Sequence, residues 1–351
     1  MDTPSSYTRT MLHKRAAEYY RQMRVSQSEW KSLNSVEPQL IEFEHLLLAG
    51  DYSQAAQLMN EIDLQLPPKT SFLFGIGHIE RAQLMREQLR DRQLEPDMQW
   101  MNLYQLGLAH TRLGNLDQAQ AAHQQGLQVA EALADLEKQG ISLVYLGLVY
   151  YHLQHFDQAI ETYQRALPLN AGKQIEGNNL GHLGNAYAGL GQLTEAVPYL
   201  ERAVDLNRQL DDKRSLAFWL GRLGDVHRRL SQQHLERATR NIEDGIAIAS
   251  QIGDSTVEVY HLRSLGAMYA QSGQDERAIE TFERALVAAQ TIGDRWNEAL
   301  ISWELGLLYE LKDTTRAIIL MSHLLEYERE HNLPELADHE RKFAEVQRRL
   351  T

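Results

Sequence analysis

Residues 183–203 read LGNAYAGLGQLTEAVPYLERA, and the pattern of this stretch returns along most of the chain. Its first two letters, Leu-Gly, recur in the same register at steps of 40, 37, 40, 42 and 40 residues. The glycines of these pairs are Gly107, Gly147, Gly184, Gly224, Gly266 and Gly306, called the repeat glycines below. Self-similarity at such a period is typical of a solenoid, in which identical supersecondary units stack on one another.

Each repeat has the pattern of two amphipathic helices joined by a short break. Around the repeat glycine the apolar residues follow helical spacing, as in Leu143, Leu146 and Tyr150. A breaker such as Gly191-Gln192 follows, and then a second amphipathic run such as residues 193–204. A glycine inside a helix costs roughly 1 kcal/mol relative to alanine. Six glycines at one position therefore predict that the paired helices approach each other closely.

The order Leu-Gly-x-x-Tyr, then Gly-Asn/Gln-x-x-x-Ala, then a second Ala resembles the tetratricopeptide repeat (TPR). That repeat usually has about 34 residues, whereas the period here is close to 40. The resemblance covers about 96–350. It implies an all-α fold, a right-handed TPR superhelix (α-solenoid) of helical hairpins. The expected domains are an N-terminal helical region with a degenerate repeat at 1–95, six TPR-like repeats at 96–332, and a C-terminal capping helix at 333–351.

The first 95 residues are helical in pattern but do not follow the repeat period. Helices are expected at 7–24, 38–49, 52–62 and 71–92, with Pro67-Pro68 ending the third. The segments LHKRAAEYYRQ, EPQLIEFEHLLLAGDYSQAAQLMNEID and IERAQLMREQL resemble the helical linker between ATPase and TPR array in bacterial STAND signalling proteins of the NACHT or NB-ARC type. The chain has no G-x-x-x-x-G-K-[ST] motif, so no nucleotide-binding residue carries over. It is either the sensor part of a larger protein or a free-standing relative.

Composition narrows the class of partner and the compartment. The formal net charge of −13 argues against a nucleic-acid partner, which requires a basic face. No run of 18 apolar residues is present, so no membrane partner is expected. The first residues lack the apolar core of a secretion signal, and cysteine is absent. These features predict a cytoplasmic protein.

Nothing in the sequence assembles a catalytic site. His152 and His155 are three residues apart, but a third metal ligand at usable spacing is missing. The acidic residues are scattered, and none of them forms an obvious pair for acid–base chemistry. The prediction is therefore a protein that is not an enzyme and that has no cofactor and no metal.

The TPR resemblance implies which residues face a concave groove on the first helices. They lie three before, one after, and four to five after each repeat glycine. The candidate groove residues are Tyr104, Leu108, Val144, Leu148, Tyr151, Asn185, Asp225, Arg228, Arg229, Arg263 and Trp303. The early repeats thus offer an apolar and aromatic patch, and the later repeats offer a polar and basic one.

Two arginines stand out because the chain as a whole is acidic. Arg228 is late on one first helix and Arg263 is early on the next, so both are predicted to reach one ligand carboxylate. The planar guanidinium suits carboxylate or phosphate. The alternative is that these arginines are solvated and form surface ion pairs worth less than about 1 kcal/mol.

Two further features bear on the ligand. In related 40-residue repeats an asparagine after Leu-Gly holds an extended peptide, but only Asn185 matches, with Asp225 as a partial substitute. This favours a short peptide, a loop or a small ligand. Leu108 and Leu148 either pack against neighbouring helices or accept a partner helix.

Two hypotheses of function follow. The first is a protein-interaction scaffold that binds a partner's peptide, loop or helix, an acidic one included, in the concave groove. The alternative is the sensor or regulatory array of a STAND-type signalling ATPase, which binds a small ligand or a foreign protein. In that case an ATPase or effector domain, in cis or in trans, is a further partner.

Overall fold

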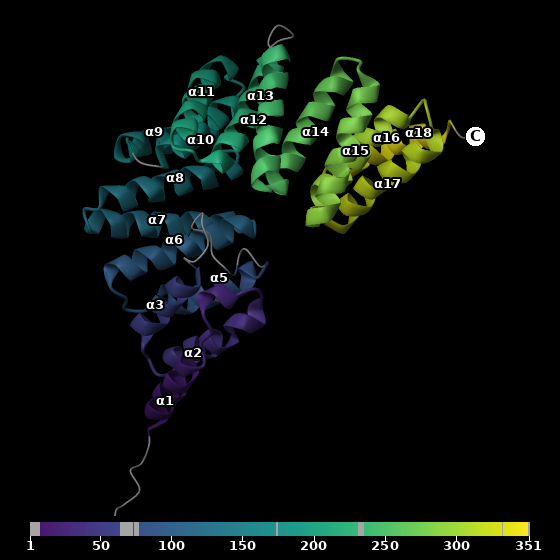
Figure 1. Cartoon of the computed structure of the whole chain (residues 1–351). Helices are drawn as coiled ribbons and strands as arrows, with labels where there is room; N and C mark the ends of the chain where they lie inside the picture. Colours follow the sequence, from purple (N-terminus) through teal and green to yellow (C-terminus); the bar gives the residue numbers. More distant parts are fainter. Residues whose placement is uncertain are drawn as a thin grey trace, which may run out of the picture. The chain divides into compact units, whose positions relative to one another are not determined.

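A computed structural model of the chain describes residues 8–63, 73, 77–172, 175–230, 235–331 and 333–349. Every regular element in these ranges is a helix, and the all-α prediction is confirmed. The chain divides into two compact units, residues 1–171 and 172–351, which are described separately (Figure 1).

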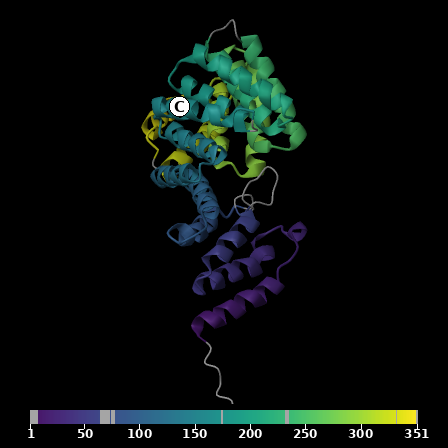
Figure 2. The same ribbon diagram turned by 90° about the vertical axis from the view of Figure 1, so that its left-hand side faces the viewer.

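The first unit opens with helices outside the repeat period. They are α1 (Arg9–Gln22), α2 (Glu37–Leu48), α3 (Tyr52–Asp63) and α5 (Ile79–Arg90), with short 3-10 turns at Gln27–Glu29 and Leu33–Val36. In Figure 2, α1, α2 and α3 lie side by side, and α1 packs on α2 and α2 on α3. The helices predicted at 7–24, 38–49 and 52–62 are present as α1, α2 and α3: α1 is shorter than predicted, α2 begins and ends one residue earlier, and α3 ends one residue later. Residues 64–72 and 74–76, with Pro67-Pro68 and the predicted start of the 71–92 helix, lie outside the described residues.

Six hairpins follow, two of them in the first unit. These two are α6 (Pro96–Arg112) with α7 (Leu116–Ala132), and α8 (Leu136–His152) with α9 (Phe156–Asn170). The other four are α10 (Ile175–Gly189) with α11 (Leu193–Gln209), α12 (Lys213–Leu230) with α13 (Leu235–Ile252), α14 (Ser255–Gln271) with α15 (Asp275–Ile292), and α16 (Arg295–Tyr309) with α17 (Thr314–His331). Within each unit, every second helix packs on the first helix of the next hairpin, as in a solenoid.

The second unit ends with α18 (Leu336–Gln347), which packs against α17. Val346 of α18 is fully buried and joins a core that includes Trp303, Met321 and Leu325. This helix occupies the place where the first helix of a further hairpin would stand. The predicted boundaries between the N-terminal region, the repeats and the capping helix stay predictions.

In all six hairpins the repeat glycine leaves room for one large side chain of the second helix. A Cβ atom added at any of these glycines would lie closer than 3.0 Å to that side chain. The side chains are, in chain order, His123, Tyr163, Leu200, Ile242, Phe282 and Met321. In three hairpins the backbone is also close: the carbonyl oxygens of Ala196, Ala238 and Ala317 would lie 3.1 Å from the added atom. The close approach predicted from the sequence is thus present, and in every hairpin the nearest neighbour is a side chain.

The turn inside the hairpin is fixed seven residues after the repeat glycine. That position has a left-handed backbone at Gly191, with φ of 79°, and at Gln154, with φ of 60°. The next N–H group then reaches back into the helix, so that Gln192 donates to the Tyr187 carbonyl at 2.9 Å. This satisfies a carbonyl that the end of the helix would leave unpaired. Gly191 therefore ends the first helix of its hairpin.

Replacing Gly184 with leucine tests the packing of the hairpin. The added side chain would overlap Leu200 and approach the Ala196 carbonyl, so the helices must separate. Overpacking of this kind costs about 1–3 kcal/mol, and more where backbone must move. We expect a lower midpoint of urea unfolding for Gly184→Leu than for Gly189→Leu, which alters an exposed glycine of the same helix. Equal midpoints for the two variants would contradict the packing described above.

Candidate functional site

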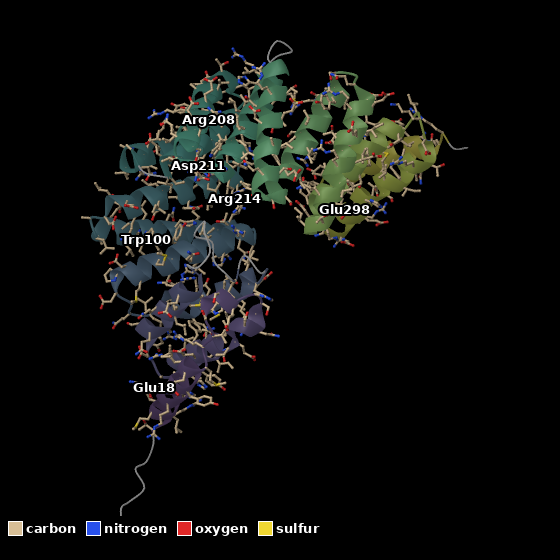
Figure 3. All side chains as sticks on the ribbon, in the orientation of Figure 1. Glu18, Trp100, Arg208, Asp211, Arg214 and Glu298 are labelled. Atoms are coloured by element: carbon tan, nitrogen blue, oxygen red, sulfur yellow. The ribbon has the colours of Figure 1, made fainter. Side chains whose placement is uncertain are left out.

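The candidate residues of the first unit begin with an aromatic cluster on α6 and α8. Tyr104 stacks on Trp100 with ring centroids 5.4 Å apart and meets Tyr145 edge to face at 5.1 Å. Burial, and next the neighbouring Tyr145, raise the pKa of Tyr104 well above its usual value. Trp100, labelled in Figure 3, also has the Lys138 ammonium 5.6 Å from its ring centroid. Tyr104 is therefore half-buried between two hairpins.

The other apolar candidates of this unit differ in accessibility. Val144 is only 2% exposed and belongs to the core. Leu108 is half-buried and packs against the core formed by α1, α2, α3 and α5. Leu148 is half-buried on α8, and Tyr151 meets Phe156 edge to face with centroids 5.5 Å apart. Leu108 thus makes the packing contact that was the alternative to binding a partner helix, and Val144 lies in the core and not at an open surface.

On α7, His123 fills the space at Gly107. Its side chain is 1% exposed, and its Nε2 has no hydrogen-bond partner in the described part of the chain. Burial, and then the charge of His110, lower the pKa of His123 to about 3. His110 itself lies 2.9 Å from Glu87 through its Nε2. His123 therefore serves as a neutral packing residue.

In the second unit, the position three before the repeat glycine is covered by a later helix on α10, α12 and α16, whereas on α14 it is the half-buried Arg263. On α10 and α12 this position is a glycine, Gly181 and Gly221, and the space is filled by Trp219 and His261. On α16 it is Trp303, which is 8% exposed and lies 4.5 Å, between ring centroids, from His339 of α18. Trp303 thus contacts the terminal helix.

An arginine cluster extends across the first helices α12, α14 and α16. We define it by seven residues: Arg222, Asp225, Arg228, Tyr260, Arg263, Gln271 and Glu304. Arg222 donates to the Tyr260 hydroxyl at 2.7 Å, and its guanidinium carbon lies 4.9 Å from the centroid of that ring. The Tyr260 hydroxyl in turn donates to Asp225. Burial raises the pKa of Tyr260, so the hydroxyl stays protonated as a donor.

Arg228 is held only loosely at the middle of the cluster. Its Nε lies 3.8 Å from Asp225 Oδ1, which is beyond hydrogen-bonding distance, and this buried atom has no hydrogen-bond partner in the described residues. Its Nη1 donates to Gln271 at a long 3.3 Å. The side chain remains 24% exposed. Arg228 thus combines an accessible guanidinium with an unused donor.

Glu304 brings a carboxyl group to the cluster from α16. Its Oε2 atom is buried and has no hydrogen-bond partner within the described ranges. Burial raises the pKa of Glu304 to about 6, while the charges of Arg263 and, less strongly, Arg228 oppose that rise. Arg263 makes no hydrogen bond or ion pair with any described residue, and acts on Glu304 and Tyr260 through its charge. The structure therefore brings Arg228 and Arg263 near one internal carboxyl group.

The remaining candidates lie beside this cluster without joining it. Asn185 is 7% exposed on α10. Arg229 is exposed on α12 and donates to the Ala188 carbonyl at 3.1 Å. Arg214, labelled in Figure 3 near the start of α12, forms an ion pair with Asp254 at 2.7 Å. Arg214 is not one of the candidates, and it has this ion-pair partner of its own.

Four members of the cluster were not among the candidate groove residues: Arg222, Tyr260, Gln271 and Glu304. Arg222 and Glu304 lie two residues before their repeat glycines, and Tyr260 lies six before its own. Together with Asp225 and Gln271, one and five residues after theirs, these positions are spaced by four, three and four residues, which is one helical face. That periodicity could have found them. Their contacts with one another depend on how successive first helices stack, which the sequence does not show.

Other classes of site are not seen in the described residues. Within those ranges, no three His, Asp or Glu side chains gather as a metal ion would need. Nor does any described helix combine the length and the apolar character needed to cross a bilayer.

Comparison of the sequence with known families gives a direct result. The profile of the tetratricopeptide repeat matches residues 98–170 and 176–251, and a second profile of this repeat matches residues 262–295. These segments make up more than half of the chain. The chain belongs to the tetratricopeptide repeat family. The TPR matches include all of α12 and residues 262–271 of α14, so Tyr260 lies between the matched segments.

Individual relatives agree with this TPR assignment. Regulatory protein RapG of Bacillus subtilis is 31% identical over 105 residues, which are 30% of this chain and 28% of RapG. A Rap protein complexed with Competence and Sporulation Factor has a similar structure, with a TM-score of 0.58 and 13% identity, over 97% of this chain and 99% of that one. The STAND protein with a TPR sensor from Pyrococcus horikoshii gives a TM-score of 0.59 and 17% identity, over 93% of this chain and 48% of that one. The chain thus spans about half the length of that STAND protein. Both structural likenesses concern the fold.

The buried, neutral His123 should make the folded protein less stable in acid. Because burial lowers the pKa of His123 to about 3, the unfolded chain binds the extra proton between about pH 6.5 and pH 3. His123 therefore favours unfolding as the pH falls through that window, by roughly 3–5 kcal/mol at its lower end. His123→Phe should remove this loss, because Phe282 fills the same position against Gly266. Urea unfolding at pH 7 and pH 4 checks it: a loss of stability in acid as large as that of the wild type would contradict the assignment.

Glu304 predicts the opposite trend with pH. Its pKa is raised to about 6 in the folded protein, so the folded state loses stability as the pH rises from about 4.5 to 6. Above that window the cost is about 2 kcal/mol. Glu304→Gln, which carries no charge, should raise the free energy of unfolding at pH 8 by up to that amount and change it little at pH 4.5. A variant less stable than the wild type at pH 8 would show that the carboxylate is a stabilising partner.

Proposed function

We propose that this TPR protein is a regulator that acts by binding a partner protein or peptide, and that the arginine cluster of α12, α14 and α16 receives an acidic group of that partner. One observation carries the proposal. The cluster holds a buried donor without a hydrogen-bond partner, Arg228 Nε, beside the unpaired Arg263, in a chain whose net charge is −13.

The chemistry of the cluster favours an anionic group. Unused hydrogen-bonding capacity in a partly buried place costs free energy, and a ligand that supplies the partner recovers it. A guanidinium group offers donors in a planar fork that matches carboxylate. Asp225 and Glu304 balance only part of the charge of Arg222, Arg228 and Arg263. A carboxylate of a bound peptide would balance the rest.

The TPR architecture supports a partner of protein or peptide class. Stacked hairpins expose the same helices of successive repeats along one surface, which suits a chain that extends across several repeats. The structural likeness to a Rap protein complexed with Competence and Sporulation Factor, and the sequence likeness to a regulatory protein, favour this class.

A second candidate function has its own support. The fold matches 93% of this chain onto the STAND protein with a TPR sensor. Under this candidate the chain controls an ATPase in cis or in trans, and the arginine cluster receives the signal. Purified chain added to a STAND-type ATPase encoded with it should change the rate of ATP hydrolysis. An unchanged rate, with and without acidic peptide, would remove this candidate.

The proposed function is tested with a defined acidic peptide. The probe is a fluorescent eight-residue peptide of alternating alanine and glutamate, and its control has glutamine in place of glutamate. We expect the acidic probe alone to bind, as measured by fluorescence anisotropy. Arg228→Gln and Arg263→Gln should each weaken the binding at least ~10-fold, since a hydrogen bond to a charged group contributes about 1.5–3 kcal/mol.

The matched control is Arg284→Gln, which removes an exposed and unpaired arginine of α15, a second helix. This variant should bind the acidic probe as the wild type does. If all three variants bind equally, or if the glutamine peptide binds as well as the acidic one, the arginine cluster is not the contact.

A further inference from the structure

The place of Glu304 shows how an acidic ligand would enter the cluster. In the first unit, Tyr104, three before its repeat glycine, meets Tyr145, two before the next. Arg263 and Glu304 hold these same two positions on α14 and α16, and Arg263 is the strongest charge acting on Glu304. At these two positions of the repeat, α14 thus carries an arginine and α16 a carboxyl group.

The contact between them is nevertheless incomplete. Glu304 forms no ion pair within 4.0 Å in the described residues, and its buried Oε2 accepts no hydrogen bond there. On the other side, Arg228 Nε is buried and donates to no described residue. A buried acceptor on α16 and a buried donor on α12 thus both lack a partner, and the charge of Arg228 acts on Glu304. A group that bridges them would satisfy both sides.

A ligand carboxylate can bridge them only if Glu304 carries a proton. An ionised Glu304 repels a second carboxylate and offers it no donor. A protonated Glu304 offers an O–H donor, and together with Arg228 Nε and the Arg263 guanidinium it makes three donors directed at one anion. The ligand's negative charge would in turn favour the protonated form of Glu304.

We propose that Glu304, Arg228 and Arg263 form a binding site for a peptide carboxylate, and that Glu304 takes up one proton when the carboxylate binds. The inference rests on the proposed function and specifies its chemistry. No covalent bond changes: the proton comes from solvent and resides on a Glu304 carboxyl oxygen while the ligand is bound. The carboxylate comes from an acidic side chain or from the C-terminus of the peptide.

The helices α14, α15 and α17, which pack against α16, all carry charged groups; on α15, Glu283 forms an ion pair with Arg316 at 2.8 Å, and Arg284 is exposed. Arg263 on α14 and Arg228 on α12 act on the pKa of Glu304. Lys342 of α18, and Arg349 just after it, form ion pairs at 3.0 and 2.9 Å with Glu310, the residue that follows α16. His339 of α18 is paired with Glu328 of α17 at 2.7 Å. The groups named here on α17 and α18 thus have partners of their own, whereas Glu304 has none among the described residues.

Proton uptake gives a measurable dependence of affinity on pH. If ligand binding raises the pKa of Glu304 from about 6 by one further unit, affinity should rise roughly five- to tenfold between pH 8 and pH 5.5. A peptide carboxylate stays ionised across this range, since its own pKa is about 4. The sign follows from linkage: a complex that binds more protons than the free protein is favoured by acid.

The test compares wild type, Glu304→Gln and Arg284→Gln with the alanine–glutamate peptide at pH 5.5 and pH 8. Glutamine carries no charge and offers an N–H donor, so Glu304→Gln should bind at pH 8 as tightly as the wild type does at pH 5.5, with no dependence on pH. Arg284→Gln should keep the dependence of the wild type. Peptides with free and amidated C-termini, each with glutamate or glutamine side chains, show which carboxylate is bound.

A second measurement needs no variant. Titration calorimetry of the wild type at pH 6.5, in two buffers of different ionisation enthalpy, counts the protons taken up on binding. We expect an uptake of roughly half a proton for each peptide bound. An uptake of zero would overturn the proposal.

The outcomes separate the inference from the function beneath it. If Arg228→Gln and Arg263→Gln weaken binding but Glu304→Gln keeps the wild-type dependence on pH, proton uptake by Glu304 is wrong and the proposed function stands. If no peptide binds, or if the arginine variants bind as the wild type does, both are wrong.

Discussion

The contact between each repeat glycine and one large side chain of its partner helix is the constraint on which the fold depends. The missing Cβ lets the two helices approach until this side chain fills the space, and the contact occurs in all six hairpins. The filling side chain varies from His123 to Met321, so the volume is kept while the chemistry is free. These contacts set how closely the two helices of each hairpin approach each other.

The same principle extends from one hairpin to the next. Trp219 and His261 lie against Gly181 and Gly221 of the preceding first helix, so a second set of glycines receives side chains across the hairpin boundary. Where this position carries a large side chain instead, as at Tyr104 and Trp303, that side chain packs against the following helix. Arg263 is the charged exception. The position that is used for packing in the other repeats carries a charge on α14, and the charge of Arg263 acts on the carboxyl group of Glu304.

Buried titratable groups divide between two roles in this protein. His123 is neutral because burial disfavours its charge, and its role is to fill space. Glu304 is less deeply buried and lies near two arginines, so its pKa remains within the range where a ligand can change its protonation. The pKa of the packing residue His123 is thus far from 7, whereas the pKa of Glu304, the proposed functional residue, is close to 7. The opposite pH trends of the two follow from the same cost of burying charge.

The sequence by itself determined the hairpin, the register of the repeats and the helical content. These depend on local rules: apolar spacing, glycines that allow close approach, and breakers such as Gly191. It also placed Arg228 and Arg263 on neighbouring first helices. Only the tertiary structure decided that Val144 and Trp303 are covered, and that Glu304, Arg222 and Tyr260 belong to the cluster with these arginines. Such contacts join residues about 40 positions apart. They depend on the rotation between stacked hairpins, which no local pattern records.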